Sequence, residues 1–128
     1  MELSILITED DQTTLNILAN LIRKKFAVKV YPAEDGKMGL EVFKAHNPDI
    51  VITDINMPVM DGIEMAREIK LIKAGTRFIV LTGYSDRNYF DRFKEIGFKD
   101  FIMKPVDFSQ LFPAIEKCLA EAALEHQC

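Results

Sequence analysis

Three short runs of apolar, largely β-branched residues end abruptly on charged residues, and this feature constrains the fold of the chain most. The acidic residues Glu9 and Asp10 follow the first run, Asp54 follows the second and Lys104 follows the third. An uninterrupted apolar run of this length is typical of a parallel strand that is buried on both faces. Charged residues at the carboxyl ends of such strands lie at the edge where open α/β sheets bind ligands. The runs are Ile5–Thr8, Ile50–Thr53 and Phe101–Met103.

Apolar runs alternate with amphipathic segments five times along the chain. Parallel strands need right-handed crossover connections, so five such units in one layer place helices on both faces of the sheet. The sequence therefore predicts a doubly wound α/β fold, a flavodoxin-like (βα)5 arrangement with a five-stranded parallel sheet in the order 2-1-3-4-5. The expected strands are Leu3–Thr8, Val28–Tyr31, Ile50–Thr53, Phe78–Leu81 and Phe101–Met103.

Length and charge limit the number of domains and the kinds of partner. A chain of 128 residues is long enough to bury one core, so we expect one domain over residues 1–122. Residues 123–128 are expected to form a tail or the start of a linker. The net charge is −4 and no window is strongly basic, so direct contact with nucleic acid is not expected. No apolar run approaches the ~20 residues of a membrane span, and no signal peptide is visible, so we expect a cytoplasmic protein.

The acidic residues Glu9, Asp10 and Asp54 are expected to converge, because the crevice of this strand order lies between the first and third strands. Carboxylates this close repel one another by ~4 kcal/mol per pair at an effective dielectric near ~20. A bound proton or a hard divalent cation would offset the repulsion, and a small oxygen-lined site suits Mg²⁺. Alternatively, the acids cap the helix that follows, an interpretation that fits Asp11 best.

Asp54 is the candidate nucleophile of this site. A carboxylate at a strand end beside a metal ion can attack phosphorus and form an acyl phosphate. The loop that follows is stiffened by Pro58 and can direct the backbone carbonyl of Asn56 at the metal. The alternative is an ordinary connection between a strand and a helix.

Two further strand ends supply groups that can bind a phosphoryl oxygen. Thr82 ends the fourth strand with a hydroxyl, and Gly83 leaves space beside it. The ammonium of Lys104 can pair with Asp54 when the site is empty and with a phosphoryl oxygen when it is filled. Pro105 could hold Lys104 in the crevice through a cis peptide bond.

Taken together, these motifs resemble the receiver domain of two-component response regulators over essentially the entire chain. The resemblance implies that Asp54 takes a phosphoryl group from the phosphohistidine of a cognate sensor histidine kinase or phosphotransfer protein. It also implies that Thr82 and Lys104 bind the phosphoryl oxygens. The implied Mg²⁺ ligands are Glu9, Asp10, Asp54 and the backbone carbonyl of Asn56.

The resemblance implies a conformational switch as well. In the family, the threonine moves toward the phosphoryl group and an aromatic residue turns inward, and here these residues are Thr82 and Phe101. Their movement alters the surface of the fourth helix, fifth strand and fifth helix, which signals to a partner or an output domain and is a candidate dimer surface. Residues Asn56 and Tyr84 flank the site and are implied to influence the lifetime of the acyl phosphate.

Two other function classes are less consistent with the sequence. A pseudo-receiver, which signals without phosphorylation, usually lacks one of the acids or the lysine, and none is missing here. A phosphatase similar to haloacid dehalogenases needs Asp-x-Asp, whereas Asp54-Ile55-Asn56 offers an amide at the third position. The resemblance to receiver domains implies that the chain catalyses only its own phosphorylation and dephosphorylation and does not act as an enzyme on other substrates.

Two positions leave alternatives open. Phe98 replaces the alanine usual in this family, and it serves either as extra packing under the fourth helix or as part of a partner surface. Pro113 is tolerable only near the start of a helix, so the last helix begins near Ser109 or its first turn is distorted.

Overall fold

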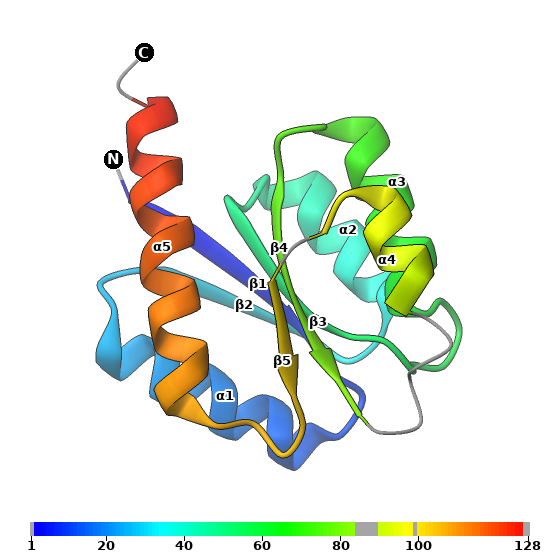
Figure 1. Cartoon of the computed structure of the whole chain (residues 1–128), viewed down its shortest axis with the longest axis horizontal. Coiled ribbons are helices and arrows are strands. Elements are labelled where there is room, and N and C mark those ends of the chain that lie inside the picture. Colours follow the sequence, from blue (N-terminus) through cyan, green and yellow to red (C-terminus); the bar gives the residue numbers. More distant parts are fainter. Residues whose placement is uncertain (1, 84–89, 99, 127–128) are drawn as a thin grey trace.

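The computed structural model describes residues 2–83, 90–98 and 100–126, which form a five-stranded sheet between two layers of helices (Figure 1). All neighbouring strands are parallel and their order is β2-β1-β3-β4-β5, so the predicted fold is confirmed. The strands are β1 (Ser4–Thr8), β2 (Lys29–Ala33), β3 (Ile50–Asp54), β4 (Arg77–Thr82) and β5 (Asp100–Met103). The helices are α1 (Gln12–Lys25), α2 (Gly36–His46), α3 (Gly62–Ile72), α4 (Phe90–Ile96) and α5 (Phe108–His126).

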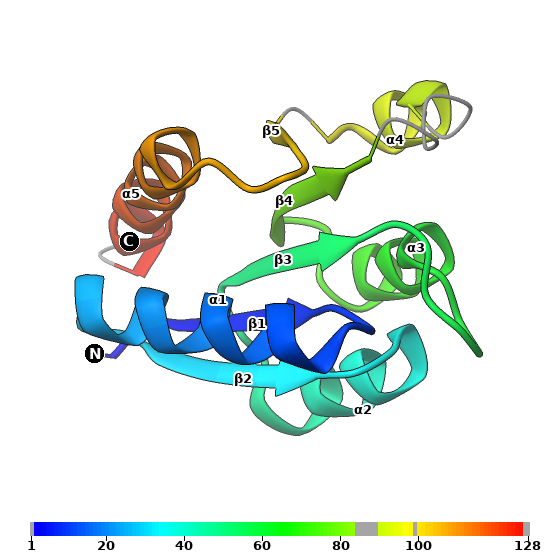
Figure 2. The same cartoon turned by 90° about the horizontal axis from the view of Figure 1, so that it is seen from below.

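The sheet separates two apolar cores, because successive side chains of a strand point to opposite faces. Helices α1 and α5 cover one face and helices α2, α3 and α4 cover the other (Figure 2). In β1, for example, Ile5 and Ile7 pack beneath α1 and α5, whereas Leu6 packs beneath α2 and α3. Both faces are therefore buried, which explains why the central strands are continuous apolar runs in the sequence.

The strand ends differ from the prediction by one or two residues. Strand β3 includes Asp54 and strand β4 includes Thr82, so both site residues are the last residues of their strands. Strand β2 begins one residue later than expected and continues through Pro32 to Ala33. A proline is tolerated there because β2 is an edge strand, where a missing N–H leaves no ladder bond unmade.

Helix α5 closes the fold at the β5 edge of the sheet. It begins at Phe108, close to the predicted start at Ser109, and Pro113 lies in its second turn. The helix runs to His126, so residues 123–126 continue it beyond the expected boundary at residue 122. Among the described segments, no helix is both long enough and apolar enough to cross a membrane.

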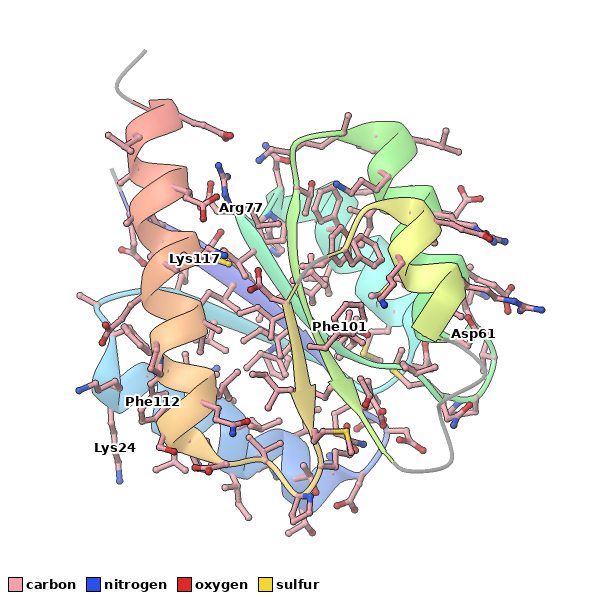
Figure 3. All side chains as sticks on the ribbon, in the orientation of Figure 1. Lys24, Asp61, Arg77, Phe101, Phe112 and Lys117 are labelled. Carbon is pink, nitrogen blue, oxygen red and sulfur yellow. The ribbon has the colours of Figure 1, made fainter. Side chains whose placement is uncertain are left out.

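An ion-pair cluster fixes α5 to the start of β4. The guanidinium of Arg77 lies 3.3 Å from a carboxylate oxygen of Glu121 and 2.6 Å from one of Glu125, and Figure 3 shows Arg77 directed toward the helix. The hydrogen bonds that Arg77 donates to Glu125 and Glu121 raise the pKa of its guanidinium despite its partial burial. These ion pairs connect α5 to the sheet at the amino ends of the strands, whereas Asp54 lies at a carboxyl end.

The structure decides between the two interpretations of Phe98. Its side chain is 5% exposed, and its ring centroid lies 4.4 Å from that of Phe78. The ammonium of Lys70 lies 5.7 Å from the centroid of each ring. The packing interpretation is therefore correct for Phe98, and the residue is not available as a partner surface. Tyr84, which the resemblance implies to influence the lifetime of the acyl phosphate, lies outside the described residues.

Candidate functional site

Three carboxylates meet at the carboxyl ends of β1 and β3, as predicted. One oxygen from each of Glu9, Asp10 and Asp54 lies within 4.8 Å of the others. Glu9 and Asp54 are 3% and 4% exposed, whereas Asp10 is exposed. An all-oxygen donor set with one open side matches the preference of a small hard cation such as Mg²⁺.

The capping interpretation holds for Asp11 alone among the acids at this corner. Asp11 is the N-cap of α1, and its carboxylate accepts a hydrogen bond from the backbone N–H of Thr14 at 3.2 Å. Hydrogen bonds from the Thr14 side chain and backbone lower the pKa of Asp11. Glu9 and Asp10 lie with Asp54 in the cluster instead, and the Glu9 carboxylate also accepts a hydrogen bond from the backbone N–H of Asp11 at 3.4 Å.

The electrostatic state of Glu9 shows that the cluster is unfavourable without a cation. Burial, reinforced by the charge of Asp54, raises the pKa of Glu9 from 4.5 to about 7. The raised pKa brings the protonation of Glu9 close to neutral pH. A divalent cation would replace that proton, and the donor set fits such an ion.

Lys104 supplies positive charge to the same crevice. Its Nζ lies 2.7 Å from Oδ2 of Asp54 and 3.4 Å from Oε2 of Glu9, so the predicted ion pair with Asp54 is present. Burial acts to lower the pKa of Lys104, but the hydrogen bond and charge of Asp54, together with Glu9, outweigh it and raise the pKa. The Lys104–Pro105 peptide bond is cis, which is the geometry that the sequence suggested.

Two buried threonines that were not predicted as part of the site form a hydrogen-bonded chain that ends on the backbone of Asp54. The hydroxyl of Thr8 donates to the hydroxyl of Thr53, which donates in turn to the backbone carbonyl of Asp54 at 2.8 Å. The backbone N–H of Ile55 donates to Oδ1 of Asp54 at 2.8 Å. A signal was present, because both threonines are polar residues within the buried runs of neighbouring strands.

The loop after Asp54 is held against the strand by its own backbone. Asp61 caps α3 by accepting a hydrogen bond from the N–H of Glu64 at 2.9 Å, and Gly62 donates its N–H to the carbonyl of Ile55 at 2.9 Å. Asn56 lies exposed in this loop, two residues from Asp54. The role of its carbonyl as a metal ligand stays a prediction.

The two predicted switch residues lie on β4 and β5. Thr82 is 1% exposed, and its hydroxyl donates to the sulfur of Met103 at 3.4 Å. Phe101 is half-buried and packs against the core on the α2, α3 and α4 side of the sheet (Figure 3). Thr82 and Lys104 are also joined directly, because the N–H of Lys104 donates to the carbonyl of Thr82 at 2.7 Å. Their roles in switching stay predictions.

Val59 provides a test of strain in the loop. Its φ is 71°, in the left-handed region where a side chain with a Cβ costs ~1–2 kcal/mol. We expect Val59→Gly to raise the free energy of unfolding by about 0.5–1 kcal/mol, since the greater freedom of glycine in the unfolded chain offsets part of the gain. Urea denaturation measures the change. Asn47→Gly is the control, because Asn47 has a φ of 49° that asparagine tolerates, and a Val59→Gly protein no more stable than wild type would contradict the prediction.

The comparison with known proteins identifies the family. Residues 5–116 match the family model of the response regulator receiver domain. The chain belongs to this family. The resemblance seen in the sequence is therefore confirmed.

Individual relatives support the same family. The receiver domain is 38% identical over 112 residues to the transcriptional regulatory protein PdtaR of Mycobacterium tuberculosis, covering 88% of this chain but only 54% of PdtaR. It is 36% identical to the chemotaxis protein CheY of Bacillus subtilis, covering 90% of this chain and 96% of that protein. A solved receiver domain from Clostridium thermocellum superimposes with a TM-score of 0.86 at 32% identity, over 95% of this chain and 98% of the other. The chain thus spans about half of PdtaR and nearly all of CheY.

Receiver domains generally depend on Mg²⁺, and the acidic cluster of this one fits that requirement. Beside the cluster, between α1 and the segment that leads into α5, lies a cavity of about 390 Å³. Glu9 and Lys104 form its polar edge, and the remaining lining is mainly apolar. The apolar lining residues are Ile17, Leu18, Pro105, Val106 and Phe108.

Proposed function

We propose that this receiver domain is a phosphoacceptor switch in which Asp54 takes a phosphoryl group from a phosphohistidine. The donor is a cognate sensor histidine kinase or a phosphotransfer protein. The observation that carries the proposal is the position of the Asp54 carboxylate, which is nearly buried, 2.7 Å from Lys104 and within the acidic cluster. Such a carboxylate is held in a fixed orientation, and the ammonium of its partner Lys104 can move its contact to a phosphoryl oxygen.

In the proposed reaction, a carboxylate oxygen of Asp54 attacks phosphorus while the phosphorus–nitrogen bond of the donor breaks, which leaves an acyl phosphate. The hydrogen bond from Ile55 fixes the other oxygen of Asp54. Lys104 then pairs with a phosphoryl oxygen, and the hydroxyl of Thr82 donates to another. When Mg²⁺ is bound by Glu9, Asp10, Asp54 and the carbonyl of Asn56, it neutralises part of the charge on the phosphoryl group.

The cavity beside Lys104 supports a docking position for the donor. Its apolar lining includes Ile17, which is 50% exposed on α1, and Pro105 and Val106 next to Lys104. An apolar side chain of the donor seated there would bring a phosphohistidine to the mouth of the crevice. We propose that the donor binds across α1 and the segment that follows β5.

The proposed output is a change in the surface of α4, β5 and α5. Phosphorylation of Asp54 draws Thr82 toward the phosphoryl group, and Phe101 turns inward from its half-buried position. This surface would then bind a downstream protein, an output domain or a second copy of the chain.

We also propose that the protein works in the cytoplasm and makes no direct contact with nucleic acid. Its proposed catalysis is limited to the phosphorylation and dephosphorylation of its own Asp54.

Intact mass measurement after incubation with acetyl phosphate and Mg²⁺ tests the proposal. We expect the wild type to gain one phosphoryl group and Asp54→Asn to gain none, because an amide oxygen is a poor nucleophile. Asp61→Asn is the matched control, since asparagine also caps a helix and the adduct should form as in the wild type. A wild type that stays unmodified, and that beryllofluoride does not perturb, would instead identify an interaction module that works without phosphorylation.

A further inference from the structure

The hydroxyl of the switch residue Thr82 has an unusual partner. Thr82 and Met103 are directly paired on the parallel strands β4 and β5, which brings their side chains together. The hydroxyl donates to Sδ of Met103 at 3.4 Å, while the Met103 residue is 49% exposed. Thr82 itself is 1% exposed, so the sulfur satisfies a hydroxyl that solvent hardly reaches.

A thioether sulfur is a weak hydrogen-bond acceptor. It is strong enough to keep a buried hydroxyl satisfied, because a buried donor without a partner is unfavourable. It is weak enough to lose the hydroxyl to an anionic phosphoryl oxygen, which forms a charge-assisted bond. The half-exposed Met103 side chain can then turn to solvent without leaving a buried cavity.

We propose that Met103 is a positioning residue that holds the Thr82 hydroxyl in the resting state and releases it when Asp54 is phosphorylated. This inference rests on the proposed function of Asp54. Met103 sets how readily Thr82 is released, because the Thr82–sulfur bond must break before the hydroxyl can donate to the phosphoryl group. Met103 directly precedes Lys104 at the end of β5. The same strand end therefore carries the sulfur that binds the Thr82 hydroxyl and the ammonium that pairs with Asp54.

A double-mutant cycle between Met103→Leu and Thr82→Val tests the proposal. Leucine replaces methionine with little change in volume but has no acceptor, so the resting hydroxyl loses its partner and the activated state is favoured. We expect Met103→Leu to bind beryllofluoride and to react with acetyl phosphate about three-fold better at saturating Mg²⁺. In the Thr82→Val background, the same leucine substitution should have no effect. Equal effects of Met103→Leu in both backgrounds would overturn the proposal.

Carbon-13 labelling of the methionine methyl groups gives a readout that a purely structural role would not move. In the wild type, addition of beryllofluoride and Mg²⁺ should shift the Met103 methyl resonance. The new position should match the position of this resonance in Thr82→Val without beryllofluoride or Mg²⁺. Met38→Leu is the matched control, since Met38 is 40% exposed on α2 and should leave beryllofluoride affinity unchanged.

Two failures can be told apart. If the wild type forms no acyl phosphate, the proposed function itself is wrong. If the adduct forms but the Met103 methyl resonance stays fixed in every protein, only the role of Met103 is refuted.

Discussion

Glu9→Gln should raise the free energy of unfolding of the metal-free protein by about 2 kcal/mol at about pH 8, even though it removes a carboxylate of the functional site. Glu9 is 3% exposed, and burial together with the charge of Asp54 raises its pKa to about 7. Glutamine has nearly the same shape, is neutral, and avoids both the desolvation and the repulsion. Lys104 retains its partner Asp54 at 2.7 Å, so the substitution leaves no buried cation unpaired.

The dependence on pH follows from the direction of this shift. Because the pKa of Glu9 is raised from 4.5 to about 7, the folded state binds more protons than the unfolded state between these values. The wild type therefore has its full contribution from Glu9 below about pH 4.5 and loses it as the pH rises through about 7. Glutamine does not titrate, so the advantage of Glu9→Gln should disappear in acid.

Urea denaturation at a series of pH values, with and without Mg²⁺, measures both effects. We expect Mg²⁺ to stabilise the wild type at alkaline pH and to have little effect on Glu9→Gln, because the variant has lost a ligand. Glu41→Gln is the control, since Glu41 is exposed on α2 and should show neither effect. A Glu9→Gln protein that is less stable than wild type at alkaline pH would show that the three carboxylates do not oppose folding.

The expected gain has a functional meaning. Crowded carboxylates oppose folding in the metal-free protein, and the same crowding would give a divalent cation its affinity. Sites of this kind persist because function requires them, although most substitutions that relieve them stabilise the fold. A stabilising substitution among Glu9, Asp10 and Asp54 would thus support their assignment to a binding site more than to the structural framework.

Much of the fold and the site could be predicted because both depend on the same pattern. The apolar run before Asp54 is continuous since β3 is buried on both faces, and its end marks the ligand edge of the sheet. Once the order of parallel strands is known, Glu9, Asp54 and Lys104 must approach one another, whatever the details of the loops. Proximity of side chains at strand ends is thus a property of topology, which the sequence pattern reveals.

The contacts that could not be predicted depend on register and on close approach. The chain of hydroxyls from Thr8 through Thr53 to Asp54 requires that the two threonines are directly opposite on β1 and β3. The bond between Thr82 and Met103 requires the corresponding register of β4 and β5. A shift of one residue would turn each pair to opposite faces, and no feature of the sequence specifies the register so finely.

Gly62→Ala should lower the free energy of unfolding by about 3 kcal/mol and slow phosphorylation of Asp54 by at least about ten-fold. A Cβ at this position would lie 2.2 Å from the backbone carbonyl oxygen of Asp54 and 3.2 Å from the hydroxyl of Thr53. The first neighbour is backbone and cannot rotate away, so either the start of α3 or the end of β3 must move. Movement of β3 would break the bond from Thr53 that orients Asp54.

Gly75→Ala is the matched control, because a Cβ there has no neighbour within 4 Å, and its stability should change by less than about 0.5 kcal/mol. Urea denaturation and the rate of adduct formation with acetyl phosphate measure the two effects of Gly62→Ala separately. The ratio between them decides which element moves. A stability loss with an unchanged phosphorylation rate means that α3 has shifted and Asp54 has not, whereas loss of both means that the carbonyl of Asp54 has been displaced. If Gly62→Ala is as stable and as reactive as Gly75→Ala, the close packing of α3 on Asp54 is not what positions the nucleophile.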